Sequence, residues 1–185
     1  LWIGMDSGGL DCFDPKTQTF TNYHHDPTNP LSLSGNEVYS ILEDRHGNLW
    51  LTTPGSGLDR MDRETGTFHN YQHDPLDSSS LSGSHGLLLF EDNEGILWVV
   101  VYGGGLSRYR PESDDFVNYK HEPGNPNSFS SNLLRAIGED NKDNLWLGTN
   151  GDGLDRFNKQ TRTVKRFQHN PEVPGSISNN LIACI

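Results

Sequence analysis

The four tryptophans of this sequence, Trp2, Trp50, Trp98 and Trp146, are spaced at a constant interval of 48 residues. Laid over itself at that shift, the sequence aligns to its end without a gap, and a Gly-Leu pair returns in every copy, at Gly9, Gly57, Gly105 and Gly153. A fixed period of this size is the signature of a repeat architecture. A unit this small does not bury a core alone, so each copy must be stabilised by its neighbours. We therefore expect four repeats, over residues 1–48, 49–96, 97–144 and 145–185.

The second period predicts four strands. Residues 36–43 are apolar and β-branched, and they end at a polar hairpin turn over 44–48. Residues 49–53 form the second expected strand, and glycines at 55 and 57 reverse the chain into a third strand over 58–62. A polar turn at 63–66 leads to a fourth strand over 67–72. Residues 74–83, a proline- and serine-containing connection, lead to the next period.

The second strand of each unit is apolar on both faces, most clearly in the run Ile96-Leu97-Trp98-Val99-Val100-Val101. A sheet that was wetted on one face would alternate polar and apolar residues, so both faces of this strand must be covered. The fourth strand is shorter and more polar, as an outer edge should be. Four antiparallel strands in a unit that is buried against neighbours on both faces describe a blade of a β-propeller. The predicted fold is therefore all-β.

The chain is out of phase with these blades. It enters at a second strand over 1–5 and leaves inside a first strand over 180–185, so three blades are whole and one is divided between the two ends. Two arrangements are open. Residues 182–185 could pair beside Trp2-Ile3-Gly4 and close a four-bladed ring, or the chain could be an arc of a larger propeller. The start at Leu1 and the incomplete fourth period favour the arc. An open arc leaves apolar faces bare, so a homo-oligomer is a further expectation.

Composition excludes several function classes. The net charge is −11, and the 14 basic residues are scattered, which argues against a nucleic-acid or anionic-membrane surface. The longest apolar run, Ile96 to Tyr102, is too short to cross a bilayer. Cys12 and Cys184 occupy non-equivalent positions in the repeat, so we expect no disulfide framework and predict that both are small buried apolar residues. No cofactor is expected.

One run of residues resembles a known repeat. It begins with Ser32-Leu33-Ser34-Gly35-Asn36, continues through Glu43-Asp44 and Gly47-Asn48-Leu49-Trp50-Leu51, and ends with Phe68-x-x-Tyr71-x-His73-Asp74-Pro75. This pattern resembles the two-component regulator propeller repeat, and it returns in every period. The resemblance implies the extracytoplasmic, periplasmic sensor part of a bacterial membrane receptor. In that family the propellers usually have seven blades and are followed by a β-sandwich, a membrane helix and an output domain such as a histidine kinase or diguanylate cyclase. Several members respond to oligosaccharides.

Residues that recur in every unit are interpreted as framework. One histidine returns per period, at His25, His73, His121 and His169, and we expect these rings to make structural hydrogen bonds rather than to hold a metal. The Glu-Asp turns at 43–44, 91–92 and 139–140 resemble calcium loops, but cations and amides stand where ligands should be. We expect their aspartates to cap nearby backbone amides. The tryptophans are predicted to be wedges between blades.

Recognition is expected where the four units differ on a face that a ligand can reach. Those positions are the entry halves of the first strands and the turns between second and third strands. They offer aromatic, cationic and amide groups suited to a small polar ligand such as a sugar. The predicted ligand-binding residues are Tyr39, His85, Tyr102, Arg135 and Asn150. Drift at solvated positions would give the same variation, so this set is a hypothesis.

The sequence contains no arrangement typical of a catalytic site, and we predict no enzyme activity. No Gly-x-Ser-x-Gly, metal-binding helix or phosphate-loop pattern occurs. A propeller lyase or glycosidase is the alternative, because propellers host both and fold does not fix function. His85 with Glu37 is the one suggestive pairing for such chemistry. A scaffold for protein partners, including neighbouring receptor domains, is the third possibility.

Overall fold

The computed structural model describes residues 1–185, and its regular structure consists of β-strands in four antiparallel sheets. In each sheet the strands follow one another in sequence order. The first sheet has three strands, β1 (Trp2–Gly4), β2 (Leu10–Asp14) and β3 (Thr19–Tyr23). The second contains β4 (Ser40–Glu43), β5 (Leu49–Thr53), β6 (Gly57–Asp62) and β7 (Thr67–Tyr71). The all-β prediction is confirmed.

The third and fourth sheets also have four strands each. The third contains β8 (Gly86–Glu91), β9 (Leu97–Val101), β10 (Gly105–Arg110) and β11 (Asp115–Tyr119). The fourth contains β12 (Leu134–Glu139), β13 (Asn144–Thr149), β14 (Leu154–Asn158) and β15 (Thr163–Phe167). The structure contains no helix of the length and apolarity needed to cross a bilayer.

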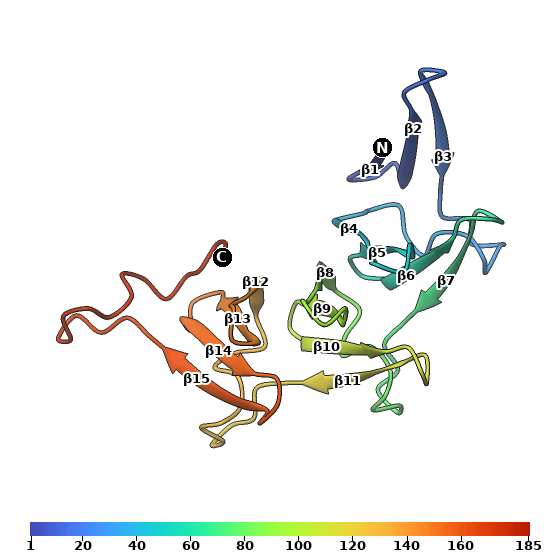
Figure 1. Cartoon of the computed structure of the whole chain (residues 1–185). Coiled ribbons are helices and arrows are strands. Elements are labelled where there is room, and N and C mark those ends of the chain that lie inside the picture. Colours follow the sequence, from blue (N-terminus) through green and yellow to red (C-terminus); the bar gives the residue numbers. More distant parts are fainter.

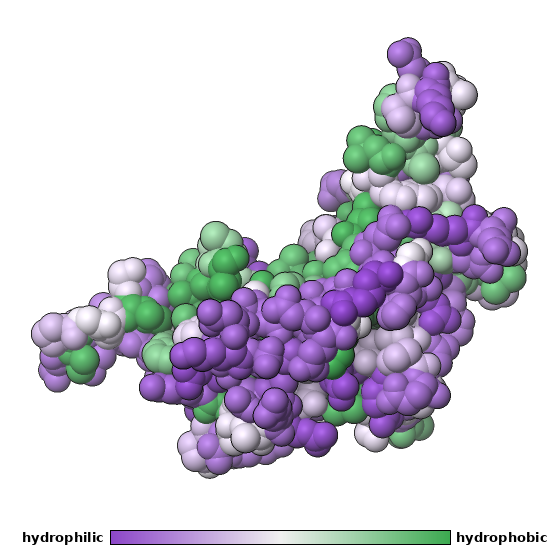
Figure 2. Space-filling model, viewed as in Figure 1, coloured by the Kyte–Doolittle hydropathy of each residue, from purple (hydrophilic) through white to green (hydrophobic).

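The four sheets stand one after another around an open arc, as Figure 1 shows, with β1, β4, β8 and β12 on the concave side. The ring-closing arrangement is not formed. Leu181 bridges Asn150, and the amide of Ile182 donates to the carbonyl of Thr149 at 3.1 Å, so the C-terminal residues lie on the fourth sheet. Figure 2 shows hydrophobic residues gathered along the concave side, above a largely hydrophilic surface.

The first strands are shorter than the sequence predicts. Regular pairing in the second sheet starts at Ser40 rather than at residue 36, because Asn36 and Val38 bond to the turn between β1 and β2. The amide of Val38 donates to the carbonyl of Met5 at 2.9 Å, and the carbonyl of Asn36 accepts from Gly9 at 2.8 Å. In the third and fourth sheets the register shifts at the same place, between Gly86 and Leu88 and between Leu134 and Ala136.

Trp50 and Trp98 are interblade wedges, as predicted, whereas Trp146 stacks on Phe167 of its own sheet. Trp50 is only 1% exposed and lies in one core cluster with Leu97, Val99 and Val101 of the next sheet. Trp98 packs in the same way against Leu145 and Leu147 of the fourth sheet. Trp2 and Trp146, near the two ends of the arc, are only partly buried. Each core cluster therefore lies between two sheets, and no sheet has a core of its own.

The glycine of each Gly-Leu pair allows the third strand to begin close to the fourth. Gly57 has a φ of +108°, a value that residues with a side chain rarely adopt. A Cβ added there would collide with the carbonyl oxygen of Tyr71. Gly9, Gly105 and Gly153 meet the corresponding carbonyl in their own sheets. The repeated glycine is thus required by backbone crowding.

The recurring histidines make structural hydrogen bonds, as the sequence predicts. In each, Nδ1 lies within hydrogen-bonding distance of the carbonyl oxygen eight residues later, at 2.8 Å for His25, 2.7 Å for His73, 2.6 Å for His121 and 2.8 Å for His169. The contact ties the start of each long connection to its end. These rings therefore hold the connections in shape.

The aspartates of the Glu-Asp turns cap backbone amides, as predicted, and they have a second role that sequence analysis missed. Oδ1 of Asp44 accepts from the amides of His46 and Asn48 at 3.0 and 2.9 Å. Its Oδ2 accepts the indole N–H of Trp50 at 2.8 Å. Asp92 and Asp140 bond Trp98 and Trp146 in the same way. Each turn thereby fixes the orientation of its own tryptophan.

The same turns join neighbouring sheets. The amide and Nε of Arg45 donate to Oε1 of Glu91 at 3.1 and 3.0 Å, and the amide of Asn93 donates to Oε2 of Glu139 at 2.7 Å. Lys159 adds a buried contact, since its Nζ donates to Glu139 at 2.6 Å and to Asp92 at 3.0 Å. We call Lys159, Asp92 and Glu139 the buried lysine latch.

The prediction that both cysteines are buried was wrong. Cys184 is exposed and Cys12 is only partly buried. Cys12 lies on β2 of the three-stranded first sheet, opposite Trp2 and Thr21, and Cys184 lies beyond the last strand. Neither position has a neighbouring sheet on both sides, and this explains why neither thiol is enclosed.

Candidate functional site

Three of the five predicted ligand-binding residues lie at or just before the start of the innermost strand of a sheet. The other two lie in turns that follow second strands. Tyr102 and Asn150 occupy equivalent turns of the third and fourth sheets, between β9 and β10 and between β13 and β14. His85 directly precedes β8, and Arg135 lies on β12. Tyr39 directly precedes β4 and is 54% exposed. Four of the five are exposed, and Asn150 is partly exposed. All five are therefore accessible to solvent.

Side-chain hydrogen bonds connect three of these residues across two sheets. Nη1 of Arg135 donates to Oδ1 of Asn150 at 3.4 Å, and Nδ2 of Asn150 donates to the phenol oxygen of Tyr102 at 3.3 Å. Backbone contacts hold the turns in place, because the amide of Tyr102 donates to the carbonyl of His85 and that of Asn150 to Leu133, both at 2.8 Å. We call the side of the arc that carries the starts of the first strands and the turns after the second strands the upper face, and Tyr102, Arg135 and Asn150 the upper-face triad.

Tyr39 lies apart from this triad, in an acidic environment. The carboxylate of Glu37 raises the pKa of Tyr39, and the charge of Asp6 adds to the effect. The structure thus brings Tyr39 together with Glu37 and not with Arg135. No hydrogen bond joins Glu37 to His85, the pair suggested for the catalytic alternative. The predicted ligand-binding residues therefore span a surface that is cationic at Arg135 and anionic around Tyr39, where Glu37 and Asp6 lie.

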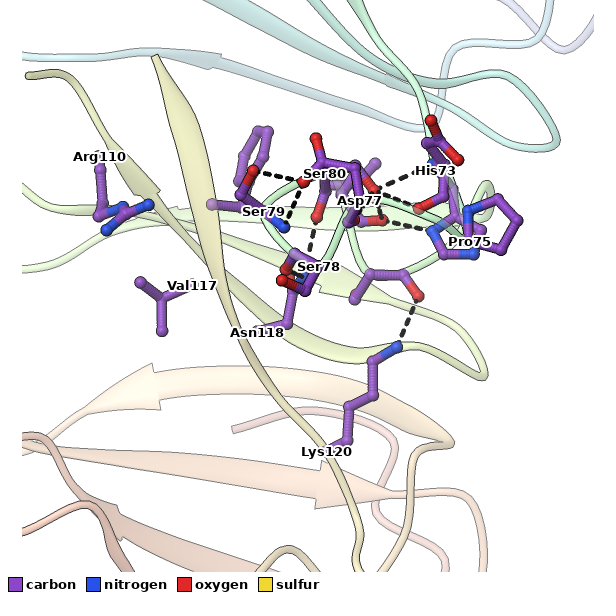
Figure 3. Close-up of a pocket in the computed structure, with 14 residues that line it drawn as sticks. His73, Pro75, Asp77, Ser78, Ser79, Ser80, Arg110, Val117, Asn118 and Lys120 are labelled. Carbon is purple, nitrogen blue, oxygen red and sulfur yellow. Dashed lines mark hydrogen bonds between the residues drawn. The ribbon is translucent and has the colours of Figure 1, made fainter. Parts of the chain in front are cut away.

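A second candidate site, which sequence analysis missed, lies on the outer side of the third sheet. It is a pocket of about 560 Å³ between the connection that follows β7 and strand β11 (Figure 3). Four of its lining residues, Ser78, Ser79, Arg110 and Lys120, differ from the residues at the equivalent positions of the other three units. The rule that recognition lies where the units disagree would have found it, had it been applied to the long connections and to the ends of the third and fourth strands.

The polar groups of this pocket are largely engaged by the fold itself. Nδ2 of Asn118 donates to the carbonyls of Ser78 and Ser80 at 3.2 and 2.8 Å, and Nζ of Lys120 donates to the carbonyl of Ser82 at 3.2 Å. Arg110 forms a bidentate pair with Asp115, with both distances 2.6 Å. These bonds hold the connection against β11, whereas the triad joins exposed side chains of two sheets, and we therefore prefer the upper face as the candidate site.

The densest group of titratable side chains lies between the second and third sheets. The phenols of Tyr71 and Tyr109 donate to Oδ1 of Asp114 at 2.6 and 2.5 Å, and Nη1 of Arg60 donates to Tyr109 at 2.8 Å. Burial alone would raise the pKa of Asp114, but the two phenol hydrogen bonds outweigh it and lower that pKa. Burial and the contact with Asp114 raise the pKa of Tyr71. These hydrogen bonds join the second sheet to the third.

Radially placed antiparallel sheets with wedge-shaped interfaces define an arc of a β-propeller. The family model described as the two component regulator propeller matches residues 32–55 and 128–151, so these two segments carry that repeat. They include Trp50 of β5 and the predicted ligand-binding residues Tyr39, Arg135 and Asn150. No curated protein matches the sequence at a significant level.

Solved structures share the fold. The extracellular domain assigned to the hybrid two component system BT3049 of B. thetaiotaomicron is 27% identical with a TM-score of 0.73, covering 91% of this chain and 22% of that one. The extracellular domain assigned to the one component system BT4673 of the same organism is 23% identical with a TM-score of 0.76, covering 99% and 23%. The inactive H270A virginiamycin B lyase of Staphylococcus aureus with quinupristin is 18% identical with a TM-score of 0.62, covering 93% and 52%. This chain thus spans under a quarter of the first two.

Proposed function

We propose that this chain is a sensor segment of a bacterial two-component-type membrane receptor and that its upper face binds a small polar ligand, with an oligosaccharide as the first candidate. The segment performs no chemistry and lies on the periplasmic side of the membrane. It works beside neighbouring receptor domains, and a histidine kinase or cyclase provides the output. Binding biases the receptor between two states by changing how the propeller packs on those neighbours.

The upper-face triad is the observation that carries this proposal. It joins a phenol, an amide and a guanidinium from two different sheets, all at positions where the repeat units disagree. Such a row of donors and acceptors beside an aromatic ring suits the hydroxyls and the apolar face of a sugar. Likeness to the extracellular domain of a two component system supports the sensor role and the location.

The first experiment measures ligand binding by the 185-residue chain. A panel of neutral, acidic and sulfated oligosaccharides is titrated by calorimetry and by thermal shift against the wild type and the variants Arg135→Ala and Tyr102→Ala. We expect one class of oligosaccharide to bind, and each substitution to weaken that binding at least tenfold. Lys142→Ala is the matched control, because Lys142 lies in the turn between β12 and β13, at the opposite end of the same sheet. Equal losses in the control would contradict a site on the upper face.

A second experiment separates the sensor from its alternatives. The same two substitutions are introduced into the full receptor, and the ligand-dependent output is measured. Loss of response with normal receptor abundance supports the proposal, and an unchanged response rejects it. Turnover of an oligosaccharide by the isolated chain would indicate a lyase or glycosidase. Absence of any saccharide binding, together with retention of a receptor domain in a pull-down, would favour the scaffold.

A further inference from the structure

The turn between β13 and β14 contains Asn150-Gly151, the one Asn-Gly pair of the sequence. Gly151 is exposed, has a φ of +117°, and has no atom within 4 Å of the position a Cβ would occupy. Its backbone N–H makes no hydrogen bond in the structure, whereas the neighbouring amides of Asn150 and Asp152 are both bonded. The nitrogen of Gly151 is therefore unhindered and free to react with the side chain before it.

The side-chain amide of Asn150 is held by groups that favour such a reaction. Arg135 donates to the carbonyl oxygen Oδ1, so its positive charge polarises the C=O bond and stabilises negative charge that develops on that oxygen. The phenol of Tyr102 lies beside Nδ2, where its O–H can protonate a departing nitrogen. No other asparagine of the chain has an arginine on Oδ1, a phenol on Nδ2 and glycine as its next residue.

We propose that Asn150 is a self-modifying position that loses ammonia to become a carboxylate. The backbone nitrogen of Gly151 attacks Cγ of Asn150 and gives its proton to water. The Cγ–Nδ2 bond then breaks, and the nitrogen leaves as ammonia with a proton from Tyr102, which water restores. The resulting cyclic imide adds one water molecule. Opening of the bond from Cγ to the Gly151 nitrogen yields aspartate, and opening of the main-chain bond yields isoaspartate.

The modification would change the charge of the upper face. A carboxylate at position 150 would face the guanidinium of Arg135 and pair with it, so the cation would no longer be free for a ligand. The isoaspartate product would also lengthen the main chain next to the bridge between Asn150 and Leu181. This inference does not depend on the proposed ligand, because it rests only on the turn and its three side chains.

Peptide mapping by mass spectrometry tests the proposal on the full chain. The native protein is incubated in mildly alkaline buffer, and every asparagine-containing peptide is followed over time. We expect the peptide with Asn150 to gain the mass difference between OH and NH2 before any other peptide does. The variant Gly151→Ala should abolish this gain within the same period, because its Cβ hinders attack. A slower gain at Asn150 than at other asparagines would overturn the proposal.

Arg135→Gln and Tyr102→Phe test whether the side chains take part. Both variants and the wild type are compared in the folded state and in concentrated urea. The proposal predicts that each substitution slows the reaction severalfold in the folded protein and has no effect in urea, where the triad is dispersed. Equal reaction rates in the three folded proteins would mean that Asn150 reacts only as any Asn-Gly pair does, and would reject the role of Arg135 and Tyr102. Circular dichroism confirms that each variant is folded.

Discussion

At the scale of single residues, Asp155 shows how the available hydrogen-bond partners determine the free-energy cost of burying a carboxylate. Asp155 is fully buried, and its Oδ1 has no hydrogen-bond partner. Burial raises the pKa of Asp155, and the hydrogen bonds from Ser130 only partly oppose that rise. Ser107 occupies the equivalent position in the third sheet, where its hydroxyl contacts Ser82 and Asn118. The equivalent residue of the third sheet thus suggests that serine destabilises the fold less than aspartate does at position 155.

We predict that Asp155→Ser raises the free energy of unfolding at neutral pH by about 1 kcal/mol, because it removes a buried oxygen without a partner. A carboxyl whose pKa is raised in the folded state destabilises the fold at a pH above that raised pKa. The cost disappears as the pH falls to the lower pKa that the carboxyl has in the unfolded chain. The gain should therefore disappear in acid. Urea unfolding at neutral and acidic pH measures both effects.

The matched control is Asp59→Ser. Burial raises the pKa of Asp59 as well, but its oxygens accept hydrogen bonds from Ser34, Thr53 and Asn70. The same substitution should therefore destabilise the chain by about 1–3 kcal/mol, because those donors lose their acceptor. Stabilisation at position 59, or destabilisation at 155, would show that the hydrogen-bond inventory does not decide the sign.

At the scale of elements, the hairpin between β14 and β15 holds the preceding sheet through the buried lysine latch. The side chain of Lys159 is 7% exposed, and those of Asp92 and Glu139 are 0% and 4% exposed. Burial alone would lower the pKa of Lys159, but the two carboxylates outweigh it and raise that pKa. The ammonium therefore stays charged, and it neutralises two buried acids at once.

We predict that Lys159→Met costs about 3 kcal/mol of stability, since removing one partner leaves buried charge without compensation. The equivalent hairpin of the second sheet provides the control. Arg63 pairs with Glu43 at 2.7 Å, but both side chains are well exposed, at 37% and 53%. Arg63→Met should therefore cost less than about 1 kcal/mol. Equal losses in denaturant unfolding would contradict the role of burial.

Element boundaries also show what sequence can and cannot predict. The hairpin strands were predictable because their patterns are local: the run around Trp98 and the turn glycines fix them within one period. The starts of the first strands were not, because Val38 bonds to Met5 of another sheet. In the candidate site, disagreement between units identified Arg135 and Asn150, but their contact depends on side-chain placement. The repeat pattern of the sequence could not predict that Tyr39 lies apart from Arg135, or that the backbone amide of Gly151 makes no hydrogen bond.

At the scale of the whole molecule, the arc gives its sheets unequal protection. The second and third sheets are covered on both faces, and Trp50 and Trp98 are each 1% exposed. The first sheet has only three strands and one neighbour, and its β3 is largely exposed. Stability in such arrays is a sum of unit and nearest-neighbour interface contributions. We therefore expect opening to start at the first sheet.

Hydrogen exchange checks this expectation. Amides of β5 and β9, whose residues are all buried, should exchange most slowly. Amides of β2 and β3 should exchange fastest among the strands. Because bare sheet faces could also associate, the experiment is repeated over a range of protein concentrations. Slow exchange in β2 and β3 that strengthens with concentration would indicate a homo-oligomer, and equally slow exchange at every dilution would contradict the predicted order.

The contacts between neighbouring sheets affect how the number of repeats can change during evolution. Arg45 reaches Glu91, and Asn93 reaches Glu139, and in both cases donor and acceptor stand 46 residues apart. A tandem duplication of one 48-residue unit in the gene would copy both halves of this contact together. Every new junction would then be complementary from the outset, so lineages can lengthen or shorten the array without evolving a new interface.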